Sequence, residues 1–332
     1  MLGICLAVCL QILEFGHLDE WLGVLYTNRE HFQTLSPTLF AWIKKRTLHS
    51  LYTIFNAIPF DKAAFFEHVR QCNAQVTGSI IMQALLGNDV FHAKDIDVFM
   101  LMQGPRVDGA DFDTPLHKYL FECATGIKVT PGQAFTLLEK QHIDQHVRCL
   151  TTEFVHEEKN SGYTTMVMNL LREVWQYQIG THQIQIITVG PAIGEEELKQ
   201  IPNSPYVRRF RDGMNCETIQ NYITQCFDIR MATSFYDGKI LCLNHITDLF
   251  DRCLVLQSYF FHRMQHCDAG DLEIYNKRLA KYFARGFHLH PKSKAALKEL
   301  CRQKNFKRAN DNDQEDEEEE HDFRFLKRNK NN

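Results

Sequence analysis

Several features that mark secreted, membrane or metal-stapled small proteins are missing from this sequence. Its 332 residues include 11 cysteines, an odd number, but no Cys-x-x-Cys pair. We therefore expect neither a disulfide scaffold nor a structural zinc site, and the cysteines indicate a reducing cytoplasmic or nuclear compartment. The apolar residues 1–13 are too few to cross a bilayer and lack the basic segment of a signal peptide, so no membrane association is expected.

The sequence also lacks an excess of positive or negative charge outside a single acidic segment. The net charge is −4, and acids gather in residues 311–322 near the end of the chain. The charges of the other residues nearly balance, so charge alone does not indicate nucleic-acid binding. The region from about residue 303 onward is highly charged and low in complexity, which predicts a disordered acidic tail.

The remaining chain has enough apolar residues for a sizeable core, with 44% hydrophobic and 11% aromatic content. Helical periodicity runs through the first part of the chain, and Asp61 is a good N-cap for a helix over residues 62–72. The pattern predicts a helical region 1–72, a core 73–247 with a helical insert 105–160, C-terminal helices 248–302 and a disordered tail 303–332.

Proline, glycine and periodicity predict further elements within these parts. The expected helices cover residues 115–123, 131–150, 218–225, 248–266 and 272–283, and the expected strands cover residues 162–168, 183–189, 227–231 and 240–243.

The stretch from Val76 to Leu101 carries most of the chemistry. It predicts a short strand ending at Thr77, a turn at Gly78-Ser79, a helix over residues 80–86 and a second strand over residues 95–101. Because side chains alternate along a strand, Asp95 and Asp97 share one face of the second strand.

Asp95 and Asp97 are candidate ligands for divalent cations. Carboxylates two residues apart on a strand lie about 7 Å apart at Cα, which lets both reach a pair of ions about 4 Å apart. Hard cations such as Mg²⁺ take carboxylates and substrate phosphates as ligands. A phosphate would also settle at Gly78-Ser79, because a helix N-terminus offers backbone N–H groups. A solvated strand face and an ordinary turn explain each feature taken alone.

In combination, these residues resemble the signature of the polymerase-β-type nucleotidyltransferase superfamily: Gly78-Ser79, Leu-Leu-Gly at residues 85–87, and Asp95-Ile96-Asp97. The resemblance implies an α+β fold with a mixed sheet and flanking helices. It also implies that Asp95 and Asp97 are catalytic and hold Mg²⁺ or Mn²⁺, while Gly78 and Ser79 bind the β- and γ-phosphates of an NTP. The expected reaction transfers NMP to an RNA 3′ end, a protein hydroxyl or a small molecule.

A second stretch, residues 226–232, is similar to the Asp-Phe-Thr-Ile-Asn-Ala motif of CCA-adding and bacterial poly(A)-adding head domains. Uncharacterised nucleotidyltransferase-like proteins of large DNA viruses look closer still, because they share this stretch and a basic-aromatic segment like residues 278–287. That likeness implies a viral protein acting in the host cell. The resemblance covers about residues 76–287, apart from an unmatched insert between Gly104 and Thr181.

The sequence departs from the family at the third carboxylate, which is expected on the strand over residues 183–189, where Gln185 stands. A neutral glutamine can neither balance the charge of a metal nor deprotonate a hydroxyl. Asp228 could act as the third acid if its strand lies beside the strand of Asp95. In the CCA-adding family, however, the matching position implies that Asp228 and Arg230 contact the nucleotide. The alternative prediction is a catalytically inactive protein that keeps the fold as a binding or scaffolding module.

Arg278, Lys281 and Arg285 fall near one face of the last predicted helix, beside Tyr282 and Phe283. Basic and aromatic side chains interleaved in this way can hold single-stranded nucleic acid by charge and stacking. An ordinary amphipathic helix also explains the pattern, and the sequence leaves both interpretations open.

Overall fold

The computed structural model of the chain describes residues 29–87, 91–101, 114–129, 146–149, 171–190, 218–257, 260–261, 264 and 269–311. Its first elements are α3 Arg29–Asn56, α4 Lys62–Gln71, β1 Gln75–Thr77, α5 Ser79–Leu86, β2 Asp95–Leu101 and α6 Pro115–Thr125. The middle elements are β3 Val147–Cys149, β4 Leu171–Ile179, β5 His182–Val189, α12 Ile219–Cys226, a 3₁₀ helix Arg230–Thr233, β6 Phe235–Tyr236 and β7 Leu241–Cys242. The last elements are α13 Ile246–Phe250, β8 Cys253–Leu254, α15 Ala269–Phe283, β9 His288–Leu289 and α16 Pro291–Asp311.

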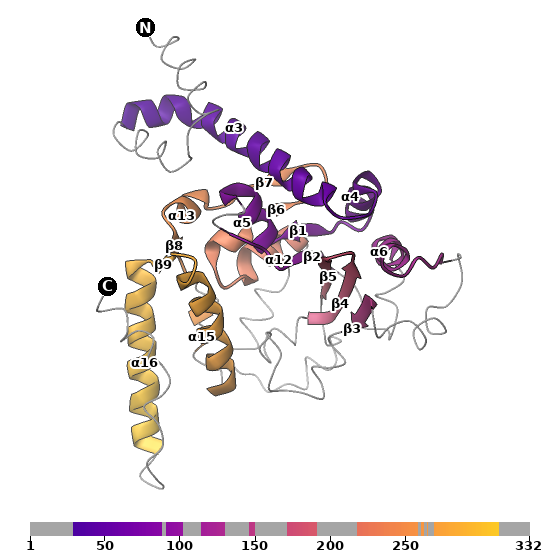
Figure 1. The fold of residues 1–332 in the computed structure, drawn as a ribbon. Coiled ribbons are helices and arrows are strands. Elements are labelled where there is room, and N and C mark those ends of the chain that lie inside the picture. Colours follow the sequence, from indigo (N-terminus) through magenta and orange to yellow (C-terminus); the bar gives the residue numbers. More distant parts are fainter. Residues whose placement is uncertain are drawn as a thin grey trace.

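The fold is mixed α/β and is centred on a seven-stranded sheet in the order β3-β4-β5-β2-β1-β6-β7. β2 and β5 are parallel, and the other neighbouring strands of this sheet are antiparallel. The predicted mixed sheet with flanking helices is therefore confirmed at this level. Helices α15 and α16 lie at the opposite end of the molecule from α6 (Figure 1). Within the described residues, no helix is both long and apolar enough to cross a membrane.

One face of the sheet is closed by four helices. Val76, Val98 and Ile186 point to this face and pack with buried side chains of α3, α4, α5 and α6. Among them, Phe55 and Phe65 are fully buried. Burying such a side chain stabilises the fold by about 1.5–3 kcal/mol, so this layer contributes strongly to the stability of the sheet.

The opposite face is divided between apolar and polar halves. Phe99 and Ile187 lie towards the ends of β2 and β5, where α12 covers them with Tyr222 and Ile223. The other half, at the starts of the same two strands, carries the acidic side chains of β2. Asp95 therefore lies on the part of this face that α12 does not cover.

A second core joins α5 to the C-terminal helices. Met82 and Leu85 of α5 pack with Phe91 and with buried residues of α13, α15 and α16. Because the other side of α5 faces the sheet core, this helix is buried nearly all round, which explains its continuous apolar sequence. The same contacts bring α15 close to the segment that leads into β2.

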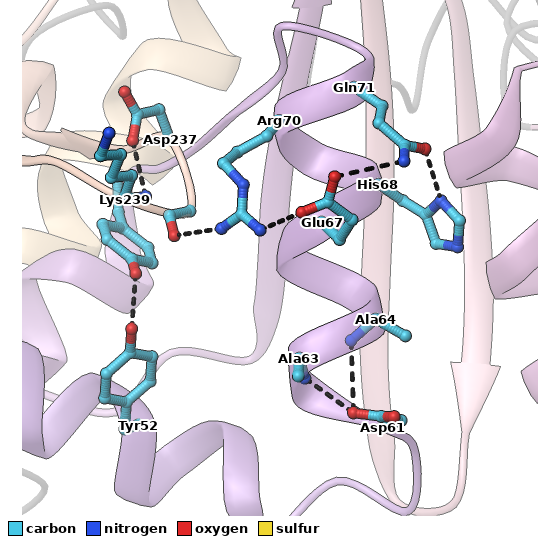
Figure 2. Close-up of polar contacts among 12 residues, drawn as sticks. Tyr52, Asp61, Ala63, Ala64, Glu67, His68, Arg70, Gln71, Asp237 and Lys239 are labelled. Carbon is cyan, nitrogen blue, oxygen red and sulfur yellow. Dashed lines mark hydrogen bonds and ion pairs between the residues drawn. The ribbon is translucent and has the colours of Figure 1, made fainter.

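Helix α4 is fixed at both of its ends. Asp61 accepts hydrogen bonds from the backbone N–H groups of Ala63 and Ala64, as its sequence predicts for an N-cap. Figure 2 shows the Arg70 guanidinium between Glu67 and the β6–β7 turn, where it donates to the Gly238 carbonyl oxygen at 2.9 Å. These contacts join the N-terminal helices to the far edge of the sheet.

The predicted strand over residues 227–231 is wrong. Ile229 makes only an isolated bridge with Leu256, and residues 230–233 form a 3₁₀ helix. Because its backbone hydrogen bonds go to residues 255–257, the segment does not enter the seven-stranded sheet. The 3₁₀ helix still lies beside the sheet, since Thr77 Oγ1 donates to the carbonyl oxygens of Ala232 at 3.3 Å and of Ser234, the next residue after the helix, at 2.7 Å.

The predicted helix over residues 248–266 is also wrong in its length. Helix α13 ends at Phe250, Arg252 takes a left-handed conformation with φ 47°, and β8 follows. β8 pairs with β9, a strand more than thirty residues later, and a contact over that distance leaves no local pattern.

Two further predictions differ from the structure near segments outside the described residues. Residues 147–149 form β3 where the sequence predicted the end of a helix, and residues 303–311 continue α16 where it predicted a disordered tail. Strand β4 was not predicted. The strand expected over residues 162–168 and the tail beyond residue 311 lie outside the described part of the chain.

Candidate functional site

The pairing of β1 with β2 brings the glycine turn against the carboxylates. Thr77 stands opposite Asp97 in this antiparallel pair, so the chain turns at Gly78 directly beside the Asp97 side chain. Gly78 has φ +75°, and a Cβ added there would lie 3.1 Å from Asp97 Oδ2. Only glycine combines this conformation with so close an approach. Ser79 begins α5, whose N-terminus therefore starts at the site.

Asp95 and Asp97 repel each other electrostatically. Burial and the nearby Asp95 carboxylate raise the pKa of Asp97 to about 7, although Arg278 and Lys281 act in the opposite direction. Both side chains keep some contact with solvent. The raised pKa of Asp97 reflects this repulsion, which a bound cation would relieve.

A polar row crosses the sheet at the level of Asp97. Register places Thr77 on one side of Asp97 and Gln185 on the other, followed by Gln176 and Arg148 on the next two strands. Residues paired in register point to the same face, so Gln185 lies next to Asp97. Gln185 is 9% exposed. A neutral amide therefore occupies the neighbouring-strand position at which a third acid would complete a carboxylate triad.

Asp228 is not a strand neighbour of Asp95 or Asp97, because β1 and β5 occupy both sides of β2. The condition under which the sequence allowed Asp228 to act as the third acid is not met. Asp228 is 4% exposed, and its Oδ2 lies 3.0 Å from Arg278 Nη1. Arg278 of α15 therefore contacts Asp228 and also lies within electrostatic range of Asp97.

Arg230 is engaged by another acid. Its Nε and Nη2 donate to the two carboxylate oxygens of Asp248 at 2.7 and 2.6 Å. Asp248 is buried, and this two-point ion pair fixes the guanidinium in one orientation. A nucleotide contact by Arg230 would have to use the part of the guanidinium that Asp248 leaves uncovered.

The sequence did not indicate that the cations at the end of α15 lie near the carboxylates of β2. Lys281 and Arg278 lie within electrostatic range of Asp97, and Arg285 within range of Asp95. Their spacing along the helix was visible in the sequence. Their closeness to Asp95 and Asp97 was not visible, because it depends on the packing of Tyr282 in α15 against Phe91.

The donor set fits one divalent cation better than two. In the described part of the chain, no group of three or more His, Cys, Asp or Glu side chains is placed to hold a metal ion. Mg²⁺ is often held by only one or two carboxylates, with waters and substrate phosphates as its other ligands. Asp95 and Asp97 meet this need, and the crowding that raises the pKa of Asp97 favours such a cation.

Comparisons with known proteins add no family assignment. No protein-family model matches the sequence, and no curated protein matches it. The fold and the geometry of the site are therefore the observations from which a function can be argued.

Proposed function

We propose that the protein is a metal-dependent nucleotidyltransferase that moves NMP from an NTP to a hydroxyl acceptor. The observation that carries the proposal is the contact between the Gly78 turn and Asp97, at the start of a helix and beside a second carboxylate. Backbone N–H groups at a helix start can bind phosphate and carboxylate oxygens can bind a cation, so their closeness supports a site for a nucleotide with its cation. The mixed sheet supports the resemblance to the polymerase-β-type fold.

Each residue of the site has a definite task in this proposal. Asp95 and Asp97 would hold Mg²⁺ or Mn²⁺, and the absence of a side chain at Gly78 would let its backbone approach the phosphate and Asp97 closely. Ser79 would contribute its hydroxyl and its backbone N–H, one of the free N–H groups at the start of α5. When bound, the cation supplies electrostatic stabilisation of the negative phosphate oxygens. The acceptor would be a hydroxyl that reaches the polar half of the sheet face.

The direct test measures NMP transfer from labelled NTP to three acceptors: an RNA oligonucleotide, a protein mixture and the chain itself. We expect Mn²⁺-dependent labelling of one of them by the native protein, and loss of labelling in Asp97→Asn. Asp251→Asn is the matched control, because Asp251 is an exposed acid in the turn after α13. A fully active Asp97→Asn protein would exclude this reaction.

A second candidate function is a catalytically inactive protein that binds nucleotide or a partner with the same fold. The observation in its favour is the buried Gln185 beside Asp97, because an amide cannot take the proton of an acceptor hydroxyl. The two functions differ in one measurement. Mg²⁺ with ATP should raise the melting temperature of the native protein but not of Asp95→Ala if nucleotide binding is kept, and only the enzyme also releases pyrophosphate.

A further inference from the structure

Three cations lie in the last turns of α15 and directly after it. Arg278 and Lys281 are three residues apart on the helix, and Arg285 lies in the turn that follows Phe283, where α15 ends. This turn continues the helical path, because Ala284 N–H donates to the Ala280 carbonyl oxygen and Arg285 N–H to that of Tyr282, so at 1.5 Å per residue the row of three cations is about 10 Å long. This length matches a single chain of a few phosphate groups better than a nucleic-acid groove, which usually holds at least about four nucleotides.

Contacts around Phe91 turn this row towards the carboxylates. The Phe91 ring is buried against Tyr282 of α15, and the Arg285 guanidinium lies over it at 3.9 Å from the ring centre. Arg285 Nη2 also donates to the His92 carbonyl oxygen at 3.0 Å. Because Phe91 and His92 lead directly into β2, the basic row is fixed beside the start of the strand that carries Asp95.

Tyr282 is not available as a stacking platform. It is 6% exposed and packs edge-on against Phe287 inside the second core. Stacking of bases on exposed aromatic side chains is what usually allows a basic surface to hold single-stranded nucleic acid. The pattern that suggested nucleic-acid binding in the sequence therefore has a different basis, since its central aromatic residue belongs to the core.

The cations of the row are crowded and incompletely neutralised. Burial, and next the charge of Arg285, lower the pKa of Lys281. Arg285 Nη1 is buried and has no hydrogen-bond acceptor among the described residues. Arg278 is held by Asp228 at 3.0 Å, which fixes its position next to the other two. A multivalent anion would supply the missing acceptors and relieve the repulsion between the cations.

We propose that Arg278, Lys281 and Arg285 bind the polyphosphate part of the nucleotide, and that Asp228 positions Arg278 within this site. The inference rests on the proposed function for the identity of the ligand. It adds that phosphate binding is shared between the start of α5 and the side of α15, across the carboxylate pair. Part of this affinity is then independent of any metal, because the cations of α15 contact the anion directly.

The experiment measures binding of inorganic tripolyphosphate by calorimetry in EDTA and low salt. We expect Lys281→Met to weaken binding about tenfold, the loss of roughly one charge-assisted hydrogen bond. Methionine keeps the apolar stem of the lysine and so preserves packing. Lys298→Met is the matched control, since Lys298 is an exposed lysine of α16, and it should bind like the native protein. Equal melting temperatures of both variants establish that they are folded.

Unchanged tripolyphosphate affinity in Lys281→Met, or no binding by the native protein, would overturn the inference. It would also be overturned if Lys281→Met lost binding to a single-stranded RNA but kept tripolyphosphate, because the row would then be a nucleic-acid surface. The two proposals can fail separately, because tripolyphosphate binding by the native protein is measured in EDTA and NMP transfer is measured with Mn²⁺. Binding without transfer would refute the proposed reaction alone, and transfer with unchanged tripolyphosphate affinity in Lys281→Met would refute the inference alone.

Discussion

Replacing Asp97 by asparagine should make the protein more stable at alkaline pH, although it removes a residue of the candidate site. Burial and the Asp95 carboxylate raise the pKa of Asp97 to about 7. In an unfolded chain the same group ionises near pH 4. Folding therefore becomes less favourable as the pH rises from about 4 through 7, because the folded protein holds the proton more tightly. Asparagine carries no charge at any of these pH values, so the variant does not lose folding stability in this way as the pH rises.

The size of the effect follows from the pKa. The difference between an ordinary aspartate pKa of 3.8 and about 7 corresponds to roughly 4 kcal/mol at 1.36 kcal/mol per pKa unit. Asp97 keeps some contact with solvent, which screens its charge, so we expect about 2 kcal/mol at pH 8. Below pH 4 both proteins should have nearly the same stability, since Asp97 is then protonated in the folded and the unfolded states.

Thermal melts from pH 4 to pH 8.5 measure this difference. The melting temperature of Asp97→Asn should exceed that of the native protein by a few degrees at pH 8, and the gap should close towards pH 4. Asp251→Asn is the control and should show no such gap. Added Mg²⁺ should stabilise only the native protein at pH 8. An asparagine variant that is equally or less stable at pH 8 would show that the carboxylates do not repel each other as described.

Three further changes have definite outcomes. Gly238→Ala should lower the free energy of unfolding by about 2 kcal/mol, because Gly238 has φ +89° and a Cβ there would lie 2.7 Å from the Phe66 carbonyl oxygen. An unchanged urea midpoint would contradict this. Asp61→Ala should cost about 1 kcal/mol in thermal melts through loss of the α4 cap, while Asp61→Asn should cost little. Gln185→Asp should tighten Mn²⁺ binding about tenfold by adding a third carboxylate beside the pair, as measured by electron paramagnetic resonance, and equal affinity would remove Gln185 from the site.

Local sequence patterns were sufficient where neighbouring residues decide the structure. The cap at Asp61, the turn at Gly78 and the alternation of Asp95 and Asp97 each depend on a few adjacent residues, and the structure confirms the elements that they predict. Local patterns gave wrong predictions where pairing with a distant segment determines the secondary structure. Residues 253–254 form a strand because they pair with β9, and residues 227–231 are not a strand of the sheet because their hydrogen bonds go elsewhere.

The sequence by itself determined the chemistry of the candidate residues: two carboxylates on one strand face, a glycine turn before a helix, and a helix with three cations. Only the tertiary structure determined which of these residues lie next to one another. It put Gln185 next to Asp97, it paired Asp228 with Arg278, and it turned the basic side of α15 towards the start of β2. The physical reason is that strand register and helix docking are set by buried apolar contacts such as those of Phe91, which join segments far apart in the chain.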